Sequence, residues 1–126
     1  MTVVSNSSPL ISLARIGKLE LLAALFGQVS IPPEVHQEVT VDGRMLPGAE
    51  EVKRAGWIRV LGPPLPPDAS LVQRCEGLGP GEAAAIYLGN YLHAELILLD
   101  EWKARRVAKE ANLPIVGCLG ILEDSI

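Results

Sequence analysis

The run E-L-I-L-L-D at residues 95–100 constrains the fold of this chain more than any other stretch. It is a short, continuous apolar segment that ends in an acid. Unbroken apolar runs of this length are typical of strands that are buried on both faces of a parallel sheet. The run therefore predicts an α/β protein, with a central, mainly parallel sheet between two layers of helices.

The rest of the chain supports this prediction, because strand-like and helix-like segments alternate along it. Further strands are expected at 3–5, 28–31, 57–61 and 115–116. Helices are expected at 8–26 with a break at Gly17, at 34–39, 49–55, 80–93 and 101–111, and at the end of the chain. Ser8 is expected to cap the first helix, with Pro9 at its first position.

Length and composition indicate a single domain over residues 1–126. The hydrophobic content is 48% but only 4% of residues are aromatic, so we expect a core of Leu, Ile, Val and Ala. The sequence shows no signal peptide and no membrane span, so we expect a cytoplasmic protein with no membrane contact. Cys75 and Cys118 are interpreted as packing residues rather than as metal ligands or a disulfide.

The net charge of −4 and the pI near 5.1 argue against a broad surface for nucleic acid. Such affinity comes largely from Lys and Arg side chains that neutralise phosphates. A small basic patch remains possible at W-K-A-R-R-V-A-K, where Lys103, Arg105, Arg106 and Lys109 fall within one predicted helix. These cations could equally form a solvated helix face.

Polar side chains stand where ligands of an open α/β sheet bind, beyond the carboxyl ends of the strands. Asn6 closes the first strand, and Asp100 closes the clearest strand with Glu101 beside it. Glu82 lies in the first turn of the preceding helix, and Glu38 lies toward the end of the helix after the second strand. A converging set of this kind needs a cation, and its oxygen donors suit Mg²⁺ or Mn²⁺.

Each of these residues also has an ordinary structural explanation. Glu82 could interact with the helix dipole, and Asp100 could cap the following helix. Glu101 could form an i, i+4 ion pair with Arg105, and Glu38 could be exposed to solvent among polar neighbours. Asn6 could be a turn former, so the metal-site hypothesis depends on the arrangement rather than on any single side chain.

Four stretches resemble the PIN domain, a family of small metal-dependent nucleases that includes the toxins of VapBC-type toxin–antitoxin pairs. They are V-V-S-N-S-S-P-L-I, I-P-P-E-V-H-Q-E-V, G-P-G-E-A-A-A-I-Y-L-G and L-I-L-L-D-E-W-K-A-R-R-V-A, and together they extend over nearly the whole chain. The resemblance implies a three-layer α/β/α sandwich with acids that bind Mg²⁺ or Mn²⁺. The catalytic and metal positions then fall on Asn6, Glu38, Glu82 and Asp100, with Glu101 as an extra ligand.

The resemblance further implies an RNA substrate, a cognate antitoxin and a homodimer, with substrate contacts from Ser8, Lys103, Arg105, Arg106 and Lys109. Because relatives of this kind often continue with a further helix, it also implies that the domain over residues 1–126 lacks a C-terminal helix. One position departs from the family pattern, since Asn6 stands where Asp is usual and supplies neither charge nor a general base. We therefore expect a metal-dependent ribonuclease, with a weak or inactive binding module as the alternative. A nucleotide-binding protein is disfavoured because the chain contains no glycine-rich phosphate loop.

Overall fold

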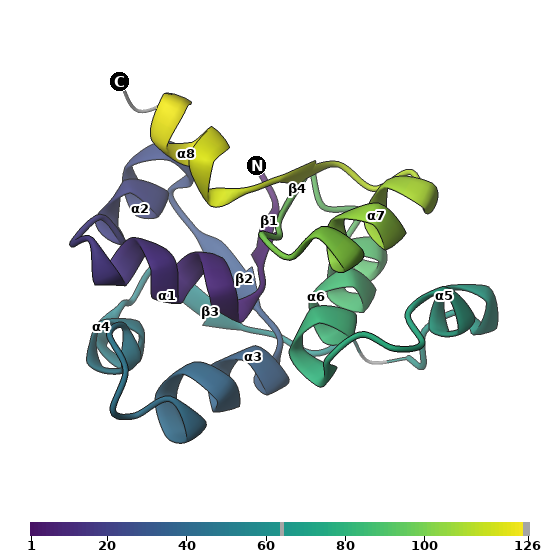
Figure 1. Cartoon of the computed structure of the whole chain (residues 1–126), viewed down its shortest axis with the longest axis horizontal. Helices are drawn as coiled ribbons and strands as arrows, with labels where there is room; N and C mark the ends of the chain where they lie inside the picture. The colour runs from purple at the N-terminus through teal and green to yellow at the C-terminus, as the bar shows by residue number, and fades with distance from the viewer. Residues whose placement is uncertain (64, 125–126) are drawn as a thin grey trace.

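A five-stranded, all-parallel sheet forms the centre of the protein in a computed structural model that describes residues 1–63 and 65–124 (Figure 1). The strands lie in the order β3-β2-β1-β4-β5. Their bounds are β1 Val3–Ser5, β2 Val29–Ile31, β3 Ile58–Val60, β4 Leu96–Leu98 and β5 Ile115–Val116. The predicted α/β class and all five predicted strands are confirmed, while residues 125–126 of the predicted domain lie outside the described residues.

The helices follow the predicted alternation with three differences. Their bounds are α1 Ser7–Arg15, α2 Glu20–Phe26, α3 Pro33–Gln37, the π-helix η1 Glu38–Asp42, α4 Ala49–Arg54, α5 Ala69–Arg74, α6 Pro80–Tyr91, α7 Trp102–Glu110 and α8 Cys118–Asp124. The expected break at Gly17 is confirmed by its positive φ of 69°. The prediction that Ser8 caps α1 is wrong because the helix begins at Ser7, and neither α5 nor the π-helical turn was predicted.

The strand order places the ends of β1 and β4 next to each other. Strands β2 and β3 lie on one side of β1. The chain then crosses over and forms β4 and β5 on the other side of β1. The backbone N–H of Asn6 donates to the carbonyl oxygen of Leu98 at an N–O distance of 3.1 Å. This is the switch point where open α/β sheets bind their ligands, and it brings Asn6 and Asp100 to the same edge.

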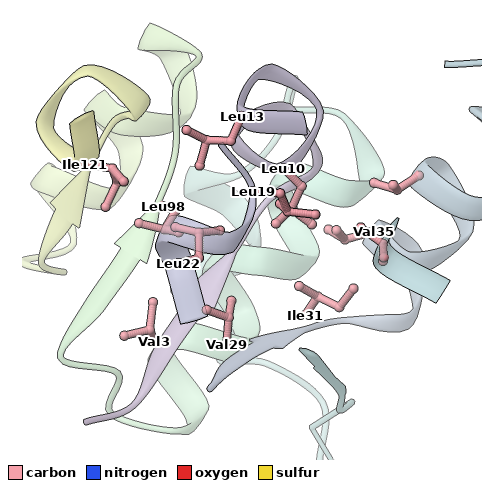
Figure 2. Close-up of a cluster of buried hydrophobic side chains, with 12 residues drawn as sticks. Val3, Leu10, Leu13, Leu19, Leu22, Val29, Ile31, Val35, Leu98 and Ile121 are labelled. Carbon is pink, nitrogen blue, oxygen red and sulfur yellow. The ribbon is translucent and has the colours of Figure 1, made fainter. Parts of the chain in front are cut away.

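One face of the sheet is covered by α1, α2, α3 and α8 (Figure 1). Figure 2 shows how side chains from these helices and from the strands pack into one apolar cluster. Val3 and Leu98 project into it from β1 and β4, and Leu10, Leu13 and Leu22 meet them from α1 and α2. These five side chains are at most 1% exposed, so this half of the core is tightly closed.

The other face is covered by α6 and α7, and α5 lies beyond α6 and adds Leu71 to the same apolar cluster. Val4 and Ile97 are the strand residues adjacent to Val3 and Leu98, and they point into this second cluster because side chains alternate along a strand. Small residues such as Ala85, Ala104 and Ala108 let α6 and α7 approach the sheet closely. The three-layer sandwich holds the starts of α1, α6 and α7 around the carboxyl ends of β1 and β4.

Candidate active site at the carboxyl ends of the strands

Among the predicted metal ligands, Asn6 is the most deeply buried, and its side chain has an oxygen atom that accepts no hydrogen bond from the described residues. Its side chain is only 3% exposed, and its Oδ1 atom has no hydrogen-bond partner among the described residues. A buried amide oxygen without a partner costs free energy, about 1–3 kcal/mol. The position directly after β1 therefore leaves one oxygen ligand free.

Glu38 is held against the start of two helices. Its Oε1 accepts a hydrogen bond from Ser7 Oγ at an O–O distance of 2.5 Å, which is typical of a strong bond to a carboxylate. The backbone of Gly81 lies so close that a Cβ there would be 2.6 Å from Glu38 Cδ. Glu38 is half-buried, so the suggestion that it is exposed to solvent was wrong.

Glu82 has both a structural and an electrostatic role. Its Oε1 accepts the backbone N–H of Gly79 at 3.0 Å, which caps α6 as a first-turn acid can. The pKa of Glu82 is raised, first by burial and then by the nearby carboxylates of Glu101 and Glu38, while the Gly79 N–H partly opposes this shift. Three acids thus share one electrostatic environment that disfavours full ionisation in the absence of a cation.

Glu101 is the N-cap of α7, accepting the backbone N–H of Ala104 at 3.1 Å. The backbone N–H of Lys103 is the main cause that lowers the pKa of Glu101, and contact with the carboxyl group of Glu82 lowers it further. The suggested cap at Asp100 is therefore wrong. So is the suggested ion pair of Glu101 with Arg105, since the described part of the chain contains no such pair.

Asp100 is turned toward the start of α8. Its Oδ1 accepts the backbone N–H of Cys118 at 2.6 Å, and the pKa of the Cys118 thiol is raised by burial and by the Asp100 charge. Arg105 Nη1 donates to the carbonyl oxygen of Leu99 at 3.0 Å beside them. Asp100 therefore lies at the predicted edge of the sheet, but its carboxylate is hydrogen-bonded to the start of α8.

A family model described as a PIN domain matches residues 2–125 of the chain. The chain belongs to the PIN-domain family. Among curated proteins, no sequence matches it. Membership agrees with the all-parallel sheet between helices, and it associates the chain with a nuclease fold, with nucleic-acid binding and, as is general for PIN domains, with divalent metal ions.

The donor chemistry of this PIN domain fits a hard divalent cation. The acids and the unpartnered amide oxygen of Asn6 offer only oxygen ligands, which suit Mg²⁺ and Mn²⁺. Among the side chains that the structure describes, however, no three from His, Cys, Asp or Glu stand close enough to hold a metal ion. Side chains would therefore have to move to complete a site, above all that of Asp100, which is bonded to the Cys118 N–H.

Of the predicted substrate-binding residues, Lys103 acts on the charge of Glu101, and Arg105 lines the same hollow as Asp100. Lys103, Arg106 and Lys109 are exposed on α7, while Arg105 is half-buried. Ser8 is exposed, and among the described residues its side chain forms no hydrogen bond with the acids, whereas its neighbour Ser7 bonds Glu38. Within the described residues, no helix has the length and apolar character needed to cross a bilayer.

Sequence reasoning missed three contributors to the site: Ser7, Gly81 and the Cys118 backbone N–H. Gly81 did carry a signal, because a glycine in the first turn of a helix costs stability relative to alanine and often marks a close approach. Nothing in the sequence distinguishes Ser7 from Ser8 as the partner of Glu38. The Cys118 contact joins residues 18 positions apart and has no local signature.

Proposed function

We propose that this PIN domain is a divalent-metal-dependent ribonuclease that hydrolyses RNA phosphodiester bonds. The observation that carries the proposal is the buried, unpartnered Oδ1 of Asn6 at the switch point of the sheet. Unsatisfied buried polar atoms in native proteins call for an explanation such as an unseen ion or water. The raised pKa of Glu82 among neighbouring acids supports the same explanation.

Asn6, Glu38, Glu82 and Asp100 are the proposed ligands, with Glu101 as an additional one. The bound Mg²⁺ or Mn²⁺ would activate water and stabilise charge on the phosphodiester oxygens. Ser7 holds the Glu38 carboxylate in place, and the Gly79 N–H holds that of Glu82.

The proposed substrate contacts are the cations of α7 and one hydroxyl group of α1. Arg105, Arg106, Lys103 and Lys109 would contact phosphates on the α7 side, and Ser8 would contact the substrate from α1. The charges of α7 therefore offset the acidic character of the chain where a polyanion has to approach.

The test is cleavage of a mixed single-stranded RNA pool with Mn²⁺, with EDTA, and with the double variant Glu82→Gln, Asp100→Asn. Both replacements keep an oxygen that can accept the N–H bonds of Gly79 and Cys118, so the fold should be preserved. Glu51→Gln, at an exposed acid on α4, is the matched control. Metal-dependent cleavage that the double variant lacks and the control retains is expected; equal inertness of all three folded proteins would exclude the ribonuclease.

A toxin role, restrained by a cognate antitoxin, extends this proposal. It is supported by the resemblance to VapBC-type toxins alone, and a homodimer is proposed on the same basis. Induced expression should arrest growth of a bacterial host, while the double variant should not. Light scattering of the purified protein tests the dimer, and growth unaffected by active enzyme would contradict the toxin role.

A non-catalytic binding module is the second candidate. It is favoured by Asn6, which brings no charge to the site, and by the hydrogen bond that holds Asp100 toward Cys118. Calorimetric titration with Mn²⁺ distinguishes the two, because a binding module need not take up metal. Absence of both metal binding and cleavage in folded protein would favour this alternative.

A further inference from the structure

Trp102 is a large aromatic side chain left in solvent, with 63% of its surface exposed in the first turn of α7. The chain contains two tryptophans, and the other, Trp57, packs partly against the core. A single exposed apolar residue needs no explanation by itself. The charged residues around Trp102 are what indicate a binding role for its exposed ring.

Trp102 shares one face of α7 with three cations. Arg105, Arg106 and Lys109 follow it at three, four and seven positions, the spacing that places side chains on one side of a helix. The same four residues, with Glu110, line one hollow of the surface. The face turned to the sheet carries the buried Ala104 and Ala108, so α7 is packed on one side and forms an aromatic and cationic surface on the other.

The charge of α7 is opposite to that of the whole protein. The helix carries four cationic side chains and one acid, although the net charge of the chain is −4. The acid, Glu110, accepts a hydrogen bond from Arg106 at an N–O distance of 3.2 Å, with both side chains more than half exposed. Exposed pairs of this kind are weak, so Arg106 can exchange Glu110 for a phosphate at small cost.

The aromatic and cationic surface begins where the acidic site ends. Trp102 directly follows Glu101, whose carboxylate adds to the effect of burial in raising the pKa of Glu82, and Arg105 donates a hydrogen bond to the carbonyl oxygen of Leu99 just after β4. An aromatic side chain flanked by cations is the arrangement that binds single strands, with a base stacked on the ring and phosphates on the cations. Paired bases are unable to use such a ring because their faces are already stacked.

We propose that Trp102 is a base-stacking platform for single-stranded RNA, with Arg106 and Lys109 as its phosphate contacts, positioned to lead the strand toward the acids. This inference rests on the proposed ribonuclease function and adds to it a substrate contact outside the acids. It assigns to Trp102 a contact with substrate that a surface residue of a purely structural helix would not make.

The test measures binding without cleavage, in EDTA, using an eight-nucleotide oligoadenylate with a fluorescein label. Trp102→Ala should weaken binding by roughly 5- to 100-fold, and Trp102→Phe by less, since phenylalanine still stacks. The matched aromatic control is Tyr91→Ala, because Tyr91 is 43% exposed at the end of α6. In a Trp57→Phe background, the fluorescence of Trp102 should be quenched by the single strand but not by duplex RNA.

A second pair of variants tests the cations. Removing Arg106 and Lys109 together should reduce the slope of log K against log salt by about 1.4, or about 0.7 per lost phosphate contact on a single strand. The matched control removes Lys53 and Arg54, two exposed cations of α4 that also pair with an acid, Glu50. This control should leave the slope unchanged.

Several results would overturn the platform: no RNA binding, equal affinity of Trp102→Ala and wild type, quenching by duplex RNA, or tighter binding of the matching DNA strand. Quenching that depends on protein concentration without RNA would instead assign the surface to a protein contact. RNA binding that requires Trp102 in a protein that never cuts RNA would exclude the ribonuclease and leave the platform. Cleavage that is insensitive to Trp102→Ala would exclude the platform and leave the ribonuclease.

Discussion

Replacing Gly81 with alanine should separate Glu38 from Ser7 without removing any acid. The new Cβ would lie 2.6 Å from Glu38 Cδ and 2.7 Å from Oε2, closer than unbonded atoms tolerate. Because the carboxylate is the end of a flexible side chain, it should move away while α6 stays in place. The hydrogen bond from Ser7 Oγ would then be lost.

The expected magnitude follows from two opposing effects. Alanine in place of a helical glycine stabilises by about 0.5–1 kcal/mol. Loss of a hydrogen bond to a charged group costs about 1.5–3 kcal/mol. The free energy of unfolding should therefore fall by about 0.5–2.5 kcal/mol, which lowers the Tm by several degrees in a domain of this size.

The informative measurement is the shift in Tm that Mn²⁺ produces. A ligand that binds only the folded state at 100 times its Kd stabilises it by about 2.7 kcal/mol, so wild type should show a clear shift. Gly81→Ala should lose most of this shift because the Glu38 ligand is displaced. Ser7→Ala removes the hydrogen bond but leaves Glu38 in place, so it should retain more of the shift.

Gly56→Ala is the matched glycine control, since a Cβ there meets nothing within 4 Å. It should behave as wild type does in both Tm and Mn²⁺ response. An unchanged Mn²⁺ shift in Gly81→Ala would refute the assignment of Glu38 as a ligand held between Ser7 and α6.

Three further predictions concern single residues of the site. The raised pKa of Glu82 means that its contribution to stability is present below its unfolded pKa near 4.5 and is lost as the pH rises through the folded value. In EDTA, wild type should therefore lose stability relative to Glu82→Gln in urea unfolding as the pH rises above about 4.5, and a difference of opposite sign would disprove the shift. Asn6→Asp should bind Mn²⁺ more tightly in calorimetric titration but lower metal-free stability, because it buries a charge; unchanged affinity would count against Asn6 as a ligand. Asp100→Asn in a Cys75→Ala background should speed the reaction of Cys118 with a thiol reagent, because the Asp100 charge contributes to its raised pKa; an unchanged rate would show that burial alone controls this thiol.

Much of the fold could be predicted because its signals are local. Each strand of this sheet is a short apolar or β-branched run, and Pro or Gly lies at the start of several helices. The helix α5 was missed because Ala69–Arg74 follows a proline-rich segment, and its one buried residue, Leu71, provides no periodicity to detect.

The candidate site was predictable at the level of positions only. Asn6 and Asp100 follow strands, so a parallel sheet must bring them to one edge, and the sequence by itself determined that much. Their bonding partners depend on distances between segments far apart in the chain, which no local pattern encodes.

Only the tertiary structure decided that Ser7 bonds Glu38 across 31 residues and that Asp100 accepts the Cys118 N–H. It likewise decided that Glu101, rather than Asp100, caps α7. The physical reason is that local preferences select helices and strands, whereas the packing of α1, α6, α7 and α8 on the sheet determines which polar atoms come within bonding distance.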